Sequence, residues 1–172
     1  MPDVDDQRRA VLYVALAQQV LPALESSTDK EYADKAIDLC WRWIEQRDVS
    51  GLTLYELFHD DEDYGVEPAM SVEFDQVKWS AWACVAQALA YTGRCAYVGE
   101  GSPIPESFSL ATLEEAHTEF MDGYQVVTQN SRVPQLLGDY LEQLPDGQLT
   151  QAVIRDKLVQ LSANRADTPG AH

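Results

Sequence analysis

The sequence predicts an all-α protein, a single-domain bundle of about six to seven helices around a central apolar helix at about residues 72–97. Apolar residues recur along the chain with the period of a helix, and no segment shows the strict alternation that marks a strand. From Trp79 to Tyr91 only Ser80 and Gln87 are plainly polar, so this helix must be surrounded by others. A chain of 172 residues buries roughly 70% of its unfolded surface, which is enough for one core.

The first two predicted helices each carry one apolar face. The first is expected to kink or end near Pro22, which lacks a backbone N–H, and its apolar stripe is Leu12, Ala15, Leu16, Val20 and Leu24. Thr28 and Glu31 form a predicted capping box that opens the second helix, because hydroxyl and carboxylate can each satisfy a backbone donor. Trp41 and Trp43 lie at the margins of its buried face, which carries Ala33, Ala36, Ile37, Cys40 and Ile44.

A short helix with Leu54, Leu57 and Phe58 on one face precedes the central helix. Ser71 is the predicted N-cap of the central helix, and Glu73 in its first turn is favoured by the helix dipole. The helix is expected to run to about Tyr97 and to tolerate Gly93.

The C-terminal half predicts three more helices. After an extended crossing at residues 103–105, a second capping box at Thr112–Glu115 opens a helix with Leu113, Ala116, Phe120, Tyr124 and Val127 in phase. Pro134 begins the next helix, and a Pro-Asp-Gly turn leads into the last one. Their apolar residues are Leu137, Tyr140, Leu141 and Leu144, then Val153, Ile154, Leu158 and Leu161. We therefore expect one helical domain over residues 1–163 and a frayed tail over residues 164–172.

The negative charge is concentrated in two stretches. The formal net charge is −17, from 29 acidic and 12 basic residues. Nine acids lie in residues 48–77 and six in residues 95–131, with no Lys or Arg in either stretch, so these supply −15 of the total. Both flank the central helix and would form one negative face if they folded to the same end. A solvated surface that merely aids solubility is the alternative. Such a charge disfavours nucleic acid or an anionic membrane and attracts a basic protein.

The remaining composition indicates a cytoplasmic protein. Residues 1–6 are acidic where a secretory signal would be basic, and the apolar run at 79–91 is too short to span a bilayer. Cys40, Cys84 and Cys95 each lie within an apolar helical pattern, so we expect reduced core residues.

Reactive groups form no convincing catalytic constellation, and no P-loop, dinucleotide glycine pattern or nucleophile elbow is present. Two Glu-x-x-His turns raise the alternative of a metal-dependent helical-bundle enzyme. Its ligands would be Glu56, His59, Glu114 and His117, with Glu45 and Glu73 as the missing pair. The phase of the short helix places Glu56 and His59 on the wet side, which argues against this site. The run Asp60–Asp63 lacks the glycine turn and distal glutamate of a calcium loop. We predict no catalytic, cofactor-binding or metal-binding residue.

Loosely spaced aromatic and small residues over about residues 33–125 resemble a known family. The matching runs are Ile37–Glu45, Val49–Gly51, Leu54–Leu57, Trp79–Trp82, Ala90–Thr92, Ala96–Tyr97 and Pro103–Glu106. They are similar to an all-α family of immunity proteins from bacterial polymorphic toxin systems, the sixth in the usual numbering. The resemblance implies a non-enzymatic antidote, made beside a toxin gene, that binds the toxin domain. The helices from Pro134 onward fall outside it.

The function expected from these observations is binding and neutralisation of a cognate secreted toxin domain by an acidic face. A nuclease is favoured as the toxin, because nucleases must bind phosphates and are commonly basic. The expected contact residues, with Tyr55 and Tyr64 as exposed anchors, are Tyr55, Asp60, Asp61, Glu62, Asp63, Tyr64, Glu67 and Glu114. A generic helical adaptor is the further alternative, and exposed aromatic residues could equally serve a homodimer.

Overall fold

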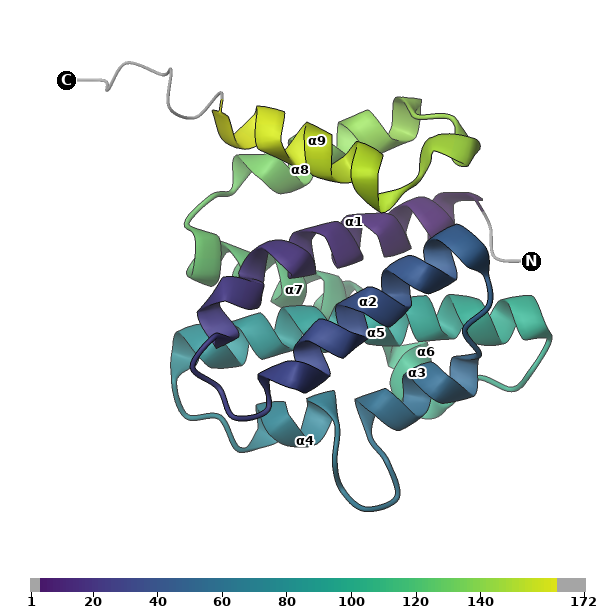
Figure 1. The fold of residues 1–172 in the computed structure, drawn as a ribbon, viewed down its shortest axis with the longest axis vertical. Helices are drawn as coiled ribbons and strands as arrows, with labels where there is room; N and C mark the ends of the chain where they lie inside the picture. The colour runs from purple at the N-terminus through teal and green to yellow at the C-terminus, as the bar shows by residue number, and fades with distance from the viewer. Residues whose placement is uncertain (1–3, 164–172) are drawn as a thin grey trace.

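Helices joined by short turns make up residues 4–163, the part of the chain that the computed structural model describes (Figure 1). The α-helices are α1 (Val4–Val20), α2 (Lys30–Gln46), α3 (Gly51–Phe58), α4 (Val66–Ser71), α5 (Gln76–Glu100), α6 (Glu106–Ser109), α7 (Glu114–Thr128), α8 (Arg132–Gln143) and α9 (Gln151–Ala163). Three 3-10 turns accompany them: η1 (Leu21–Leu24), η2 (Leu110–Thr112) and η3 (Asp146–Gln148). Seven of the α-helices have eight residues or more, and no strand occurs within residues 4–163, so the predicted all-α bundle is confirmed.

The central helix of the bundle is α5, as its apolar sequence predicts. Every residue from Ser80 to Tyr97 is buried except Gln87 and Arg94, which are half-buried. Helices α1, α2, α3, α4 and α7 all pack against α5, whereas α8 and α9 lie beyond α1 (Figure 1). A helix that is apolar on every face needs such neighbours on all sides. No helix within the described residues has the length and apolar character needed to cross a membrane.

Gly93 allows an aromatic cluster to pack directly on α5. A Cβ atom at this position would lie 2.2 Å from Cε2 of Phe108, so only glycine leaves room for that ring. The Phe108 ring is fully buried, and its centroid lies 5.4 Å from that of Tyr55, 5.5 Å from that of Phe58 and 6.1 Å from that of Tyr97. These edge-on contacts join α3, α5 and α6 into one unit.

The two predicted capping boxes are wrong. Helix α2 begins at Lys30, whose backbone N–H donates to the carbonyl of Ser27 (3.4 Å), so a backbone turn takes the place of the Thr28 hydroxyl. Helix α7 begins at Glu114 without a side-chain cap. The Thr112 hydroxyl instead donates to the carbonyl of Ser109 (3.0 Å) and closes η2. In both places the threonine that the sequence assigns to the helix start lies in the turn before the helix.

The start of the central helix also differs from the prediction. Ser71 ends the short helix α4, where its hydroxyl donates to the carbonyl of Pro68 (2.8 Å). The N-cap of α5 is Asp75, whose Oδ1 accepts from the backbone N–H of Lys78 (3.0 Å). Sequence analysis missed α4 and α6, which have six and four residues and are too short to show a helical period.

The remaining sequence expectations concern the two ends of the domain. Helix α1 ends at Val20 and continues as η1, which contains Pro22, so the predicted break is confirmed. Near the C-terminus, Arg8 fastens the end of α8 to α1, because its Nε donates to the carbonyl of Leu141 (2.8 Å) and its Nη2 to that of Leu144 (3.0 Å). The predicted tail, residues 164–172, lies outside the described residues.

The three cysteines are buried free thiols, as expected.

Candidate functional site

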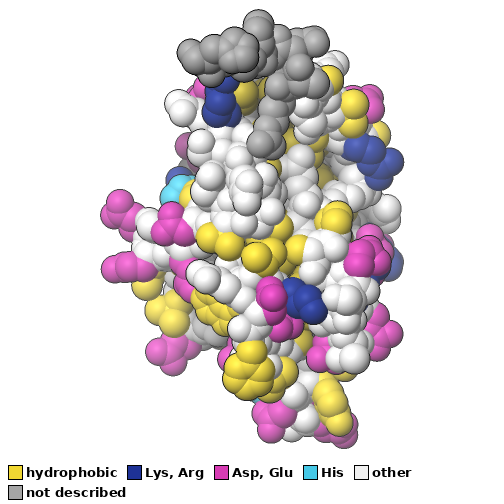
Figure 2. Space-filling model, turned by 90° about the vertical axis from the view of Figure 1, so that its left-hand side faces the viewer, with side chains coloured by type: hydrophobic (Ala, Val, Ile, Leu, Met, Phe, Trp, Pro, Cys, Tyr) yellow, Lys and Arg dark blue, Asp and Glu magenta, His cyan; other side chains and the backbone are white. Residues whose placement is uncertain are grey.

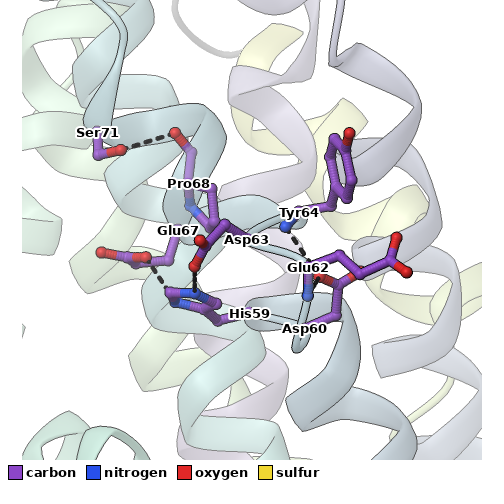
Figure 3. A network of polar contacts seen from close by, with 8 residues as sticks. All are labelled: His59, Asp60, Glu62, Asp63, Tyr64, Glu67, Pro68 and Ser71. Atoms are coloured by element: carbon purple, nitrogen blue, oxygen red, sulfur yellow. Dashed lines mark hydrogen bonds and ion pairs between the residues drawn. The ribbon is translucent and has the colours of Figure 1, made fainter.

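The acidic loop, residues Asp60–Gly65, joins α3 to α4 and is held in shape by its own hydrogen bonds (Figure 3). Oδ1 of Asp60 accepts from the backbone N–H of Glu62 (2.8 Å) and from that of Tyr64 (2.9 Å). The backbone N–H of Asp60 in turn donates to the carbonyl of Tyr64 (2.9 Å). The Asp60 carboxylate therefore organises the loop, which is the usual role of an aspartate at a turn.

His59 clasps this loop to α4 (Figure 3). Its Nε2 lies 2.9 Å from Oδ1 of Asp63, and its Nδ1 lies 2.9 Å from Oε2 of Glu67. A neutral imidazole has one N–H, so two carboxylate partners favour the doubly protonated cation. The hydrogen bond to Asp63, helped by the charge of Glu67, raises the pKa of His59 above its ordinary value. Two of the predicted contact residues thus serve an internal ion pair.

The outward-facing part of the predicted set borders a groove between α2 and α3. The groove has a volume of about 540 Å³ and is lined by Tyr55, Asp60, Asp61 and Glu62 among others. Asp61 and Glu62 are exposed. Tyr64 is 55% exposed and is available as an anchor. Tyr55 is half-buried because its ring packs against Phe108, so the expectation of an exposed Tyr55 is wrong.

Glu114, the last member of the predicted set, lines a different hollow between α5 and α7. This α5–α7 hollow has a volume of about 580 Å³. Its residues from α5 are Gln76, Trp79 and Ser80, and those from α7 are Glu114, Glu115, Thr118, Glu119, Asp122, Gly123 and Val126. Gly123 brings the helices close together, since a Cβ there would lie 3.1 Å from the carbonyl oxygen of Ser80. Sequence reasoning did not find this hollow, although the spacing of Glu115, Glu119 and Asp122 places them on one helix face.

An exposed apolar segment leads into the α5–α7 hollow. Phe74 is 99% exposed, and Val72 (64%) and Val77 (43%) are exposed beside it. Val72 and Phe74 lie in the connection between α4 and α5, and Val77 lies in the first turn of α5 beside Gln76, which lines the hollow. Figure 2 views the molecule from this side and shows acidic side chains projecting beside exposed hydrophobic ones. The observable signal in the sequence is an aromatic residue between two acids, Glu73 and Asp75, just before a long helix.

The two acidic stretches of the sequence meet on the surface of α5. A smaller hollow of about 150 Å³ is lined by Phe58 and Met70 from the first stretch and by Leu110 and Glu119 from the second. The first stretch uses most of its carboxylates internally, as the loop and the His59 contacts show. A further example is Asp48, which makes a bidentate ion pair with Arg42.

The two Glu-x-x-His turns serve unrelated contacts. Nδ1 of His117 lies 2.6 Å from the hydroxyl of Tyr13 in a partly buried position. Burial, with the nearby charge of Arg9, lowers the pKa of His117 below its ordinary value. His59 belongs to the clasp on the acidic loop instead. Within the described residues, no group of three or more His, Cys, Asp or Glu side chains is arranged to hold a metal ion.

Exposed apolar surface such as that at Phe74 often marks a site that binds another protein. Comparison with family models gives a match to the immunity protein family Imm6 over residues 8–127. The chain therefore belongs to the Imm6 family of immunity proteins, as the aromatic pattern in its sequence indicates. The matched region ends within α7, so α8 and α9 lie beyond it. Comparisons with curated proteins and with solved structures gave no match.

Proposed function

We propose that this protein is a non-enzymatic antidote that binds a cognate secreted toxin domain in the cytoplasm and neutralises it by forming a stoichiometric complex. Membership of the Imm6 family carries this proposal, because an immunity protein acts on a toxin. The net charge of −17 supports a basic toxin, since opposite charge speeds the encounter and rejects acidic partners. A nuclease is the toxin class that this charge favours, because a nuclease must itself bind phosphates.

The proposed contact zone is the acidic loop with its neighbours, together with Glu114 in the separate α5–α7 hollow. The set is Tyr55, Asp60, Asp61, Glu62, Asp63, Tyr64, Glu67 and Glu114, and its members have different roles in the structure. Asp61, Glu62 and Tyr64 face solvent and would meet the toxin directly. Asp60, Asp63 and Glu67 hold the loop in the shape that presents them.

Co-expression tests the proposed function. The toxin domain encoded beside this gene should arrest growth of a host when it is expressed alone, and co-expression of this protein should restore growth. The purified proteins should form a one-to-one complex, measured by light scattering. Growth arrest that persists despite abundant folded protein, with no complex in vitro, would refute the proposal.

Charge reversal tests the contact zone separately. The double variant Asp61→Lys/Glu62→Lys should slow association with the toxin domain about tenfold at low salt and flatten its salt dependence. The matched control is Asp139→Lys/Glu142→Lys, which makes the same change of net charge at exposed positions on α8. Equal association rates for the two double variants would show that the loop is not the contact.

A further inference from the structure

We infer that the α5–α7 hollow and the exposed segment Val72–Val77 form a docking site for a basic segment of the toxin that carries an apolar anchor residue. The inference rests on the proposed function and adds a second contact surface to the acidic loop. The site combines a row of carboxylates on α7 with an apolar surface supplied by α5 and the segment before it. Of the described residues that line the hollow, none is a lysine or an arginine.

The carboxylates of α7 make fewer contacts within the chain than those of the first acidic stretch. Within the described residues, six of the nine acids in that stretch make hydrogen bonds or ion pairs: Asp48, Asp60, Asp63, Glu67, Glu73 and Asp75. In the second stretch, Glu100 caps α3 by accepting from the backbone N–H of Gly51 (2.7 Å). Glu114, Glu115, Glu119 and Asp122 instead line the hollow on α7. Exposed charges that lack an internal partner contribute most to the attraction of a cation.

The apolar part of the site projects from a fixed backbone. Oε1 of Glu73 accepts from the backbone N–H of Asp75 (3.0 Å), and the Asp75 carboxylate caps α5. These bonds restrain the backbone next to Phe74, so less backbone freedom remains to be lost on binding. Trp79 is half-buried in the hollow, and Val126 (38% exposed) lies on its α7 side. Aromatic side chains on a fixed scaffold are the usual anchors of protein interfaces.

The chemistry of the site favours a basic protein segment over other occupants. A second copy of this chain would place acidic rim against acidic rim, and each copy carries −17. A small ligand in the hollow would leave Phe74 uncovered, because that ring projects from the preceding segment. A toxin segment with lysines or arginines on one side and an apolar residue on the other would satisfy both parts of the surface.

Two variants and two controls test the docking site with the toxin domain encoded beside the gene. Phe74→Ala should raise the dissociation constant of the complex at least tenfold. Leu136 is exposed on α8, and Leu136→Ala should change the dissociation constant less than twofold. Glu115→Lys/Glu119→Lys should slow association at least tenfold in low salt. Its control is Asp139→Lys/Glu142→Lys on α8. Circular dichroism of each variant should match that of the unmodified protein, since all the altered side chains are exposed.

The outcomes separate this inference from the proposed function. A tight complex with the unmodified protein that is unaffected by Phe74→Ala and by the α7 charge reversal would overturn the docking site and leave the antidote function standing. Sensitivity confined to Asp61→Lys/Glu62→Lys would likewise overturn it in favour of the acidic loop. If the unmodified protein neither binds nor neutralises the toxin domain, both proposals are wrong. A dimer of this chain that Phe74→Ala dissociates would identify the surface as a self-contact and overturn the inference.

Discussion

Replacing Gly93 with alanine should destabilise the protein, although alanine is the better helix former. The new Cβ would lie 2.2 Å from Cε2 of Phe108 and 2.8 Å from its Cδ2 and Cζ atoms. Normal carbon contacts are about 3.5–4.0 Å, so the ring would have to move by more than about 1 Å. Phe108 is fully buried against the rings of Tyr55, Phe58 and Tyr97, which block that movement. The substitution therefore forces either the ring or α5 to shift.

The expected size of the Gly93→Ala effect follows from two opposing contributions. Overpacking of a core costs about 1–3 kcal/mol, and the deep overlap at Phe108 favours the upper end of that range. The gain in helix propensity offsets about 1 kcal/mol. The net loss of about 1–2 kcal/mol in the free energy of unfolding should lower the melting temperature by about 2–8 °C.

Gly138→Ala is the matched control for Gly93→Ala. Gly138 lies inside α8, and a Cβ there would meet no atom within 4 Å. The same substitution should therefore raise stability by about 0.5–1 kcal/mol. Thermal and urea unfolding followed by circular dichroism would measure both. A Gly93→Ala protein as stable as the unmodified chain would show that the Phe108 cluster yields easily, and the packing argument would fail.

Three further predictions concern titratable and tethering side chains. His59 has a raised pKa, so the stability contributed by its contacts with Asp63 and Glu67 should be fully present below about pH 6.5. That stability should be lost as the pH rises through the raised pKa. NMR titration of His59 checks the direction of the shift, and unfolding of His59→Gln provides the reference. Burial raises the pKa of the Cys40, Cys84 and Cys95 thiols to about 12, so native protein should resist iodoacetamide at pH 8, and rapid labelling would contradict this. Arg8→Ala should speed amide hydrogen exchange in α8 and α9 while leaving α5 unchanged, because Arg8 fastens the end of α8.

The fold could be predicted from the sequence because the signals behind it are long and repeated. A run as apolar as Trp79–Tyr91 has one stable environment, which is the middle of a bundle. Helix starts are a different matter, because a single hydroxyl decides between a cap and a turn. The Thr112 hydroxyl could either cap α7 or close the preceding turn. In the structure it donates to the carbonyl of Ser109 and closes the turn at residues 109–112. Local signals of one residue therefore failed where periodic signals succeeded.

The candidate site was harder to predict because exposure depends on tertiary placement. An aromatic residue such as Tyr55 near acidic residues reads as a surface anchor, yet its ring is half-covered by Phe108, which lies 53 positions further along the chain. Phe74 has a similar sequence context and is 99% exposed. The difference lies in whether another helix happens to pass the side chain, and no pattern within a few residues carries that information.

Net charge and docking place are separate properties of an acidic protein, and this chain illustrates why. The long-range attraction of a cationic partner depends on the sum of all charges, so a total of −17 predicts the sign of the partner without reference to the fold. Docking depends on charges within about one Debye length, roughly 8–10 Å, where an internal cation cancels a carboxylate. Asp63 and Glu67 share the His59 imidazole, which offsets at most one of their two charges when it is protonated, whereas Glu115 and Glu119 border a hollow with no lysine or arginine among its described lining. Carboxylates that look alike in the sequence thus differ in how strongly they attract a partner at close range. The contact surface is better predicted by carboxylates that have no nearby cation and lie beside apolar surface than by the net charge.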